Sequence, residues 1–424
     1  MKKRNTKQAI CEVKFNEFAN RMTQGFGKIE KNFINDMLLG ISKSKSVLLS
    51  EIARNSVSGV QVKKSVERFS RQLCKFDSTQ LEKNRIGLTK EILPEHKLYI
   101  LDDSELVKSC ATKMEALDFV RDGSDDGKLK LGYHLSEIVC VSQSKQPASV
   151  HSELYSVRET RFSSANAITR NAIAKVVKTC GNGLFVCDRG FDDVKLFEFF
   201  EKMKQKYIIR VKNNRDIFCD DMVENIDKAA RKLKGKFSFS INFQAGKKEN
   251  LKASFKKVYL PKMITTPLYM VVVYGFSKDE GKPFYVLTNL KIKNKEDCIK
   301  VVRGYLYRWK IEEYFKFKKQ CYEFEDVRIR SLKALKNLNL MLTAVITFLA
   351  ILGNSELRRW LITLAQPIRE KVIFEYYRLL AGFCILSKDL RIKPQKPPPK
   401  PDRFIPKQYD FFYMLRYRRK EFLG

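Results

Sequence analysis

Histidine and paired cysteine are scarce in this sequence of 424 residues. It contains three histidines, His96, His134 and His151, and its ten cysteines stand singly with no Cys-X-X-Cys pair. Zinc fingers and zinc hydrolases need clustered Cys or His ligands, so the composition argues against both classes. The scattered cysteines also give no reason to expect a disulfide framework.

Long apolar runs are also missing. The N-terminus, Met1 to Lys7, is basic and polar and leads into no apolar stretch of the kind that a signal peptide requires. The most apolar run, residues 340–352, is too short to cross a bilayer and includes Thr343 and Thr347, which favours a buried core helix. We therefore expect a cytoplasmic protein with no membrane partner.

Acidic residues are far outnumbered by basic ones. The sequence has 82 Lys and Arg against 48 Asp and Glu, a formal net charge of +34. Such a charge attracts polyanions, nucleic acid above all, although a ribosomal protein, a membrane-surface protein or a lysine-rich proteome would share it. The length predicts two or three domains, because a single core rarely grows this large.

Residues 1–92 have a basic, helical pattern. Two short helices are expected over 46–54 and 62–73, separated by a Gly-containing turn, and the second is rich in Lys and Arg. This arrangement is typical of a helix-turn-helix DNA-binding domain. An ordinary pair of antiparallel helices with a solvated face fits the pattern equally well.

The rest of the chain changes character several times. Apolar strands expected at 98–101, 133–142, 149–156, 184–187 and 207–212, with helices at 164–180 and 194–204, predict a mixed α/β core over residues 93–212. Residues 213–290 read as a β-rich insertion, and 291–352 as the helical remainder of the core, starting after an N-cap at Asn294. Residues 353–424 are expected to be helical, followed by a Pro-Lys linker at 393–401 and a basic tail.

Two carboxylates, Asp102 and Asp188, directly follow apolar strands. The ends of strands in an α/β sheet are where functional side chains are commonly presented. Taken singly, either aspartate is weak evidence, because an Asp after a strand usually caps a turn.

A helix expected over 301–320 carries four polar residues at matching positions. At about 100° per residue, Tyr305, Arg308, Glu312 and Lys319 fall within an arc of roughly 60°. The stripe could form one wall of an active site, or it could be a solvated face with ion pairs. Three carboxylates with oxygen-only ligation suit two Mg²⁺ or Mn²⁺ ions, which can drive an in-line displacement at phosphorus.

These residues occur in motifs that resemble the bacterial DDE transposases of insertion-sequence family four. The run from Tyr305 to Lys319 matches that family's Y-(2)-R-(3)-E-(6)-K signature, and the segments 102–106 and 184–191 are similar to its two Asp motifs. The resemblance implies a ribonuclease-H-like core with a β-rich insertion between the last core strand and the Glu helix. The spacing agrees, because the 124 positions from Asp188 to Glu312 are far too many for one short connection.

The resemblance also implies roles for individual residues. Asp102, Asp188 and Glu312 would be the catalytic metal ligands; the expected DNA contacts are Tyr305, Arg308, Lys319, Arg210 and Lys212. Asp102 is preferred to Asp103 as the first ligand because the family places a hydroxyl residue two positions later, here Ser104. Asp103 would then point to the other face of the strand.

The resemblance implies a transposase that cleaves at terminal inverted repeats and joins the 3′-hydroxyl ends to target DNA. It would act in the bacterial cytoplasm, at the nucleoid, as a homodimer on double-stranded DNA. A nuclease with the same core and no strand transfer, or a non-catalytic DNA-binding derivative, remains open. Trp309 and Trp360 both lie outside the insertion, so a hairpin intermediate would need a Tyr or Phe for base stacking.

Overall fold

The computed structural model describes residues 2–56, 60–108, 111, 113–123, 125–243, 247–276, 282–365 and 374–387. Residues Met1–Leu390 form one compact unit. The boundaries expected near 92, 212, 290 and 352 all lie within this unit. The Pro-Lys linker and the basic tail expected after it lie outside the described residues.

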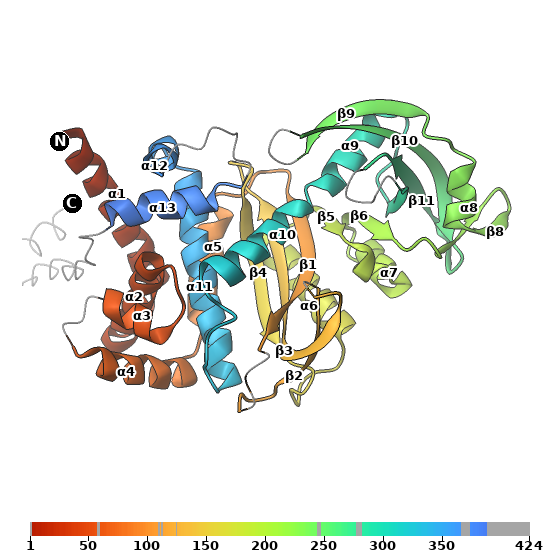
Figure 1. Cartoon of the computed structure of the whole chain (residues 1–424). Helices are drawn as coiled ribbons and strands as arrows, with labels where there is room; N and C mark the ends of the chain where they lie inside the picture. Colours follow the sequence, from red (N-terminus) through yellow and green to blue (C-terminus); the bar gives the residue numbers. More distant parts are fainter. Residues whose placement is uncertain are drawn as a thin grey trace, which may run out of the picture. The chain divides into compact units, whose positions relative to one another are not determined.

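The first part of the chain is helical, as predicted. Its helices are α1 (Lys2–Met22), α2 (Lys28–Ser44), α3 (Leu49–Asn55), α4 (Val62–Lys75) and α5 (Thr79–Lys90). They pack on the later helices α11 (Leu332–Gly353) and α13 (Tyr376–Leu386) (Figure 1). Phe15 of α1 contacts Phe348 of α11 edge-on, with ring centroids 5.1 Å apart, and both rings are buried. The N-terminal helices therefore share a core with the rest of the unit.

A mixed sheet follows, which confirms the expected α/β class. Its strands are β1 (Leu98–Val107), β2 (Asp118–Asp122), β3 (Lys128–Val141), β4 (Pro147–Tyr155), β5 (Leu184–Cys187) and β6 (Lys206–Val211). Strand β1 pairs antiparallel with β3, and β3 pairs with β4, while β5 and then β6 add in parallel on the other side of β1. The connecting helices are α6 (Ala165–Cys180), the 3-10 turn η1 (Arg189–Phe191) and α7 (Val194–Lys202).

Strand β1 is longer than its apolar run indicated. The expectation that it ends at Asp102 is wrong, because residues 103–107 continue the ladder with β3 and their polar side chains do not interrupt the backbone hydrogen bonds. Its parallel pairing with β5, however, stops at Leu101 and Cys187. Asp102 and Asp188 are thus the next residues on neighbouring strands, which places the two carboxylates at the same point of the sheet.

The β-rich insertion is present and extends the core sheet. It contains β7 (Asp216–Cys219), β8 (Met222–Asn225), α8 (Ile226–Arg231), β9 (Phe237–Phe243), β10 (Lys247–Leu260), β11 (Met263–Tyr274) and β12 (Phe284–Thr288). The last of these pairs antiparallel with core strand β6, so the order continues β6-β12-β11-β10-β7-β8. The insertion is therefore anchored to β6, which runs parallel to β5, the strand directly before Asp188.

The single helix expected over 301–320 is wrong. Helix α9 (Lys295–Leu306) begins at the predicted N-cap Asn294, whose side chain accepts from the backbone N–H of Asp297. It ends in a tight turn, because the N–H groups of Tyr307 and Arg308 donate to carbonyls only three residues earlier. Helix α10 (Trp309–Lys316) follows and runs into a π-helix, Phe317–Cys321. The tight turn and the π-helix both change the rotation per residue, so the value of about 100° per residue does not apply along the whole of 301–320.

Helix α11 contains the apolar run at 340–352 and begins eight residues before it. Its 22 residues are long and apolar enough to cross a membrane, which corrects the expected length, but 83% of its apolar window is buried within the protein. The interpretation as a core helix is confirmed by this burial. The C-terminal region adds α12 (Arg358–Leu364) and α13 beside it.

Candidate active site

Three carboxylates converge on one guanidinium group, that of Arg308. Its Nη1 donates to Oδ2 of Asp102 at 3.1 Å, and its Nε lies 3.9 Å from Oδ1 of Asp188. Its Nη2 donates to Oε1 of Glu312, one turn further along α10. The structure therefore brings together the three predicted metal ligands, which are widely separated in the sequence.

Secondary structure explains this convergence. Strands β1 and β5 are parallel neighbours whose last paired residues are Leu101 and Cys187. Asp102 and Asp188 directly follow these two residues. Helix α10 packs against β1, and Arg308 is its N-cap residue with helical backbone angles, so Arg308 and Glu312 share one face four residues apart. Two strands and one helix turn therefore fix all four side chains.

Tyr305 supports Asp188 from the end of α9. Its side chain is buried, its ring packs on Phe284 of β12, and its hydroxyl donates to Oδ1 of Asp188 at 3.2 Å. Burial and then the charge of Asp188 raise the pKa of Tyr305 above its ordinary value, so the hydroxyl remains a donor. Tyr305 thus positions Asp188, a role that the sequence did not predict.

The site is short of positive charge. Burial, with added repulsion from Asp188 and Asp103, raises the pKa of Asp102 to about 8, although Arg308 acts in the opposite direction. Burial lowers the pKa of Arg308, but Asp188 and the other neighbours outweigh it and raise that pKa above its ordinary value. One guanidinium among three carboxylates leaves the cluster with a negative formal charge when all are ionised.

The neighbouring Asp103 belongs to the other face of β1. In the β1–β3 ladder Asp102 lies opposite Glu137, whereas Asp103 lies opposite Ser136. Successive side chains of a strand point to opposite faces. Arg308 contacts Asp102, so Asp103 faces away from the carboxylate cluster, as the choice of Asp102 requires.

Comparison with known proteins agrees with this geometry. A family model described as the transposase DDE domain matches residues 96–348, more than half of the chain and all three carboxylates. The chain belongs to this family of DDE transposases. The search of curated proteins found no match to this chain. A solved structure of the piggyBac transposase synaptic complex with hairpin DNA is similar over 93% of this chain and 87% of that one, at 11% identity and a TM-score of 0.46.

In this DDE transposase Lys319, the fourth member of the predicted stripe, pairs with a carboxylate outside the cluster. The Nζ of Lys319 lies 3.5 Å from Oε1 of Glu325, and no contact joins it to the three carboxylates among the described residues. Lys319 is part of the π-helix, so a regular α-helical projection does not apply to it. The predicted contact of Lys319 with DNA stays a prediction.

A cleft of about 1170 Å³ opens beside Asp188, between the core and the insertion. Arg210 and Lys212, at the end of β6, both line it, so the structure places these two predicted DNA contacts next to the site. Four further cations line the cleft: Arg121, Arg189, Arg231 and Lys282. Arg189 could have been found from its place beside Asp188, but Arg121 and Arg231 come from β2 and α8, which have no clear sequence pattern.

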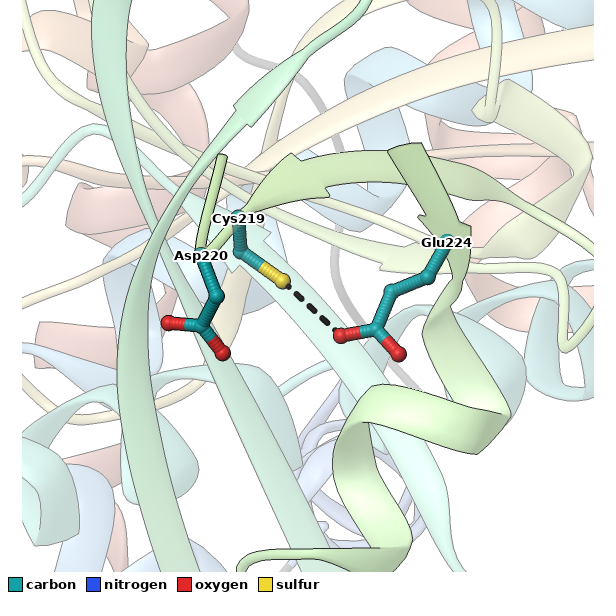
Figure 2. A group of neighbouring side chains, drawn as sticks. All are labelled: Cys219, Asp220 and Glu224. Atoms are coloured by element: carbon teal, nitrogen blue, oxygen red, sulfur yellow. Dashed lines mark hydrogen bonds between the residues drawn. The ribbon is translucent and has the colours of Figure 1, made fainter. Parts of the chain in front are cut away.

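A second acidic group lies at the turn between β7 and β8. The ligand atoms of Cys219, Asp220 and Glu224 all lie within 4.8 Å of one another (Figure 2). Lys256 pairs with Asp220, and Lys232 lies 2.8 Å from Glu224. Burial and the hydrogen bond to Glu224 raise the pKa of Cys219 to about 11, so the thiol is protonated at neutral pH. These neighbours already neutralise the group, and we assign no metal to it.

Proposed function

We propose that this transposase cuts DNA at the ends of its element and joins the freed 3′-hydroxyls to target DNA. The convergence of Asp102, Asp188 and Glu312 on a single cationic group carries the proposal. Divalent ions, two Mg²⁺ or Mn²⁺, would be held by the same three carboxylates.

The residues fit such ions. All three ligands are carboxylate oxygens, which Mg²⁺ and Mn²⁺ prefer, and burial disfavours the negative charge of Asp102 until a cation offsets it. When bound, two ions activate a water or a 3′-hydroxyl and stabilise the leaving oxygen. The chain itself holds the ligands in place: Tyr305 orients Asp188, and Arg308 would exchange its carboxylate partners for a DNA phosphate.

The arrangement of strands supports a ribonuclease-H-like core. Three antiparallel strands, β1, β3 and β4, are followed by the parallel strands β5 and β6 on the other side of β1. The Y-(2)-R-(3)-E-(6)-K spacing favours insertion-sequence family four within the DDE transposases. We further propose a bacterial cytoplasmic enzyme that works at the nucleoid as a homodimer on terminal inverted repeats.

Helices α3 and α4 are the proposed readers of the end sequence. They correspond to the two helices predicted around the Gly-containing turn, and α4 buries Phe69 and Leu73 towards the core. Its opposite face exposes Lys63, Lys64 and Arg71. An amphipathic helix with a basic outer face suits insertion into a DNA groove.

Plasmid cleavage tests the proposal. The substrate carries the gene with its flanking DNA, so that both element ends are present. Wild type should cut at these ends in Mg²⁺ but not in EDTA, and Glu312→Ala should lose cutting while still binding DNA. Glu313→Ala removes the neighbouring carboxylate, which has no bond to Arg308 among the described contacts, and should keep activity. Equal cutting by Glu312→Ala would remove Glu312 from the active site.

Strand transfer separates the transposase from a nuclease. A pre-cleaved element end with a free 3′-hydroxyl should become joined to a target plasmid in Mg²⁺. Hydrolysis without joined product would favour the nuclease, and binding without either reaction would favour a non-catalytic derivative.

A further inference from the structure

A second cleft, of about 1080 Å³, lies where strand β1 ends. One wall is formed by the start of α3, with Leu48 and Leu49, and by Val66 of α4. The other wall consists of Val107 of β1 and the segment 325–330 that leads into α11. The cleft therefore separates the helix pair with the basic outer face from the strand that carries Asp102.

The segment 327–330 presents two arginines to this cleft. Burial alternates along this segment: Val327 and Ile329 are buried, whereas Arg328 and Arg330 are exposed. In an extended chain, side chains two residues apart point to the same side and are spaced by about 7 Å. Both arginines line the cleft, so they form a short row of positive charge on one wall.

Hydrogen bonds from the core hold the backbone of this segment. The buried Lys108 amine donates to the carbonyl oxygens of Phe324 and Val327 at 3.0 and 2.9 Å. The backbone N–H of Glu115 donates to the carbonyl of Arg330 at 2.8 Å. The side-chain carboxylate of Glu115 accepts a hydrogen bond from the backbone N–H of Leu332 at 2.9 Å. The two arginines thus project from a fixed backbone, and less entropy is lost when they bind a ligand.

The charge of this row is not neutralised within the described part of the chain. No ion pair of Arg328 or Arg330 is formed there, in contrast to Arg308, which contacts three carboxylates. Of the two acidic residues in the cleft, Glu325 already pairs with Lys319. Asp326 is exposed, and Lys108 and Lys113 also line the cleft. The cleft is therefore suited to an anionic ligand with more than one negative group.

We propose that this cleft binds the DNA phosphate backbone, with Arg328 and Arg330 each contacting a phosphate between the reading helices and the active site. The proposal rests on the proposed function, because it takes the ligand to be the transposase's own DNA. Val107 follows Asp102 by five residues of β1, roughly 17 Å. At about 3.4 Å per base step, that length corresponds to about five steps of duplex DNA from the cut. DNA held by α4 would thus reach the carboxylates through this cleft.

The salt dependence of DNA binding tests the contacts. The full chain is titrated against a labelled duplex taken from the DNA that flanks the gene, in EDTA so that no cleavage occurs. Each lost phosphate contact makes the slope of log K against log salt less steep by about 0.9. Arg328→Gln with Arg330→Gln should therefore reduce the steepness by about 1.8 and weaken binding.

Two control variants make the result specific. Arg328→Lys with Arg330→Lys keeps both charges and should keep the wild-type slope. Arg359→Gln with Lys178→Gln removes two exposed cations outside the cleft and should also leave the slope unchanged. A wild-type slope in the Arg328/Arg330 glutamine variant, with its thermal unfolding also unchanged, would overturn the proposal.

The outcome is distinguishable from failure of the proposed function. If wild type binds the duplex but never cleaves it in Mg²⁺, the catalytic proposal fails while the reduced slope of the glutamine variant still supports the cleft. If wild type cleaves and the glutamine variant binds with the wild-type slope, only the cleft proposal fails.

Discussion

Replacing Asp102 with asparagine is expected to lower the rate of DNA cleavage in Mg²⁺ by on the order of a thousandfold or more. The substitution keeps the size of the side chain and removes one of three anionic ligands. Metal ions contribute several kcal/mol to such reactions, and each 1.4 kcal/mol corresponds to about tenfold in rate. Asp102 contacts the same guanidinium as Asp188 and Glu312, so the loss of its negative charge weakens the ligand set that the three carboxylates form together.

Asp103→Asn is the matched control, since it removes a carboxylate from the next residue of the same strand. Asp103 faces the other side of β1, opposite Ser136, and should not bind the ions. Its cleavage rate should stay within about tenfold of wild type, a difference of about 1.4 kcal/mol. Single-turnover cleavage of an end-containing duplex measures both rates. Loss of cleavage in Asp103→Asn with activity retained in Asp102→Asn would reverse the assignment of the first ligand.

The second large effect concerns stability. Lys318→Met is expected to lower the free energy of unfolding by about 3–5 kcal/mol, because it leaves the buried carboxylate of Glu137 without its positively charged partner. Lys318 and Glu137 pair with no solvent exposure of either side chain. The Lys318 amine also donates to the hydroxyls of Ser152 and Thr343, each at 3.0 Å. This group ties the π-helix after Glu312 to β3, β4 and α11.

Urea denaturation followed by two spectroscopic probes measures the effect, provided that the two transitions coincide. Lys319→Met is the control, because its partly exposed pair with Glu325 should contribute less than about 1 kcal/mol. Glu137→Leu combined with Lys318→Met removes both charges and should recover much of the loss. If Lys318→Met costs no more than Lys319→Met, the buried pair does not hold the π-helix in place.

The elements that sequence predicted best have unbroken apolar runs. Strand β5 is four apolar residues, three of which, Phe185, Val186 and Cys187, are fully buried, and it ends where the pattern ends. Strands β2 and β10 were missed because their sequences are polar and rich in charge. Their stability comes from partners: β10 is paired on both edges, with β9 and with β11. Such pairing joins segments that no local pattern connects.

The carboxylates could be predicted from motif and spacing, whereas the geometry around them could not. Gly304 lies in the turn that ends α9, but an isolated Gly is tolerated within a helix, and no Gly or Pro marks the π-helix after Lys316, so the sequence predicted one regular helix. That helix placed Lys319 on one stripe with Glu312 and left the Tyr305 hydroxyl free to contact DNA. In the structure Tyr305 donates to Asp188 and Lys319 pairs with Glu325.

The central claim is that Asp102, Asp188 and Glu312 bind metal ions, and Asp188→Cys tests it most directly. A thiolate ligand disfavours the hard Mg²⁺ and accepts softer ions such as Cd²⁺. The account predicts that this variant cleaves DNA poorly in Mg²⁺ and regains cleavage when Cd²⁺ is added, while Asp188→Asn stays inactive in both and wild type gains nothing from Cd²⁺. Cleavage by Asp188→Cys in Mg²⁺ at the wild-type rate would contradict a metal-binding role for Asp188 and with it the proposed active site.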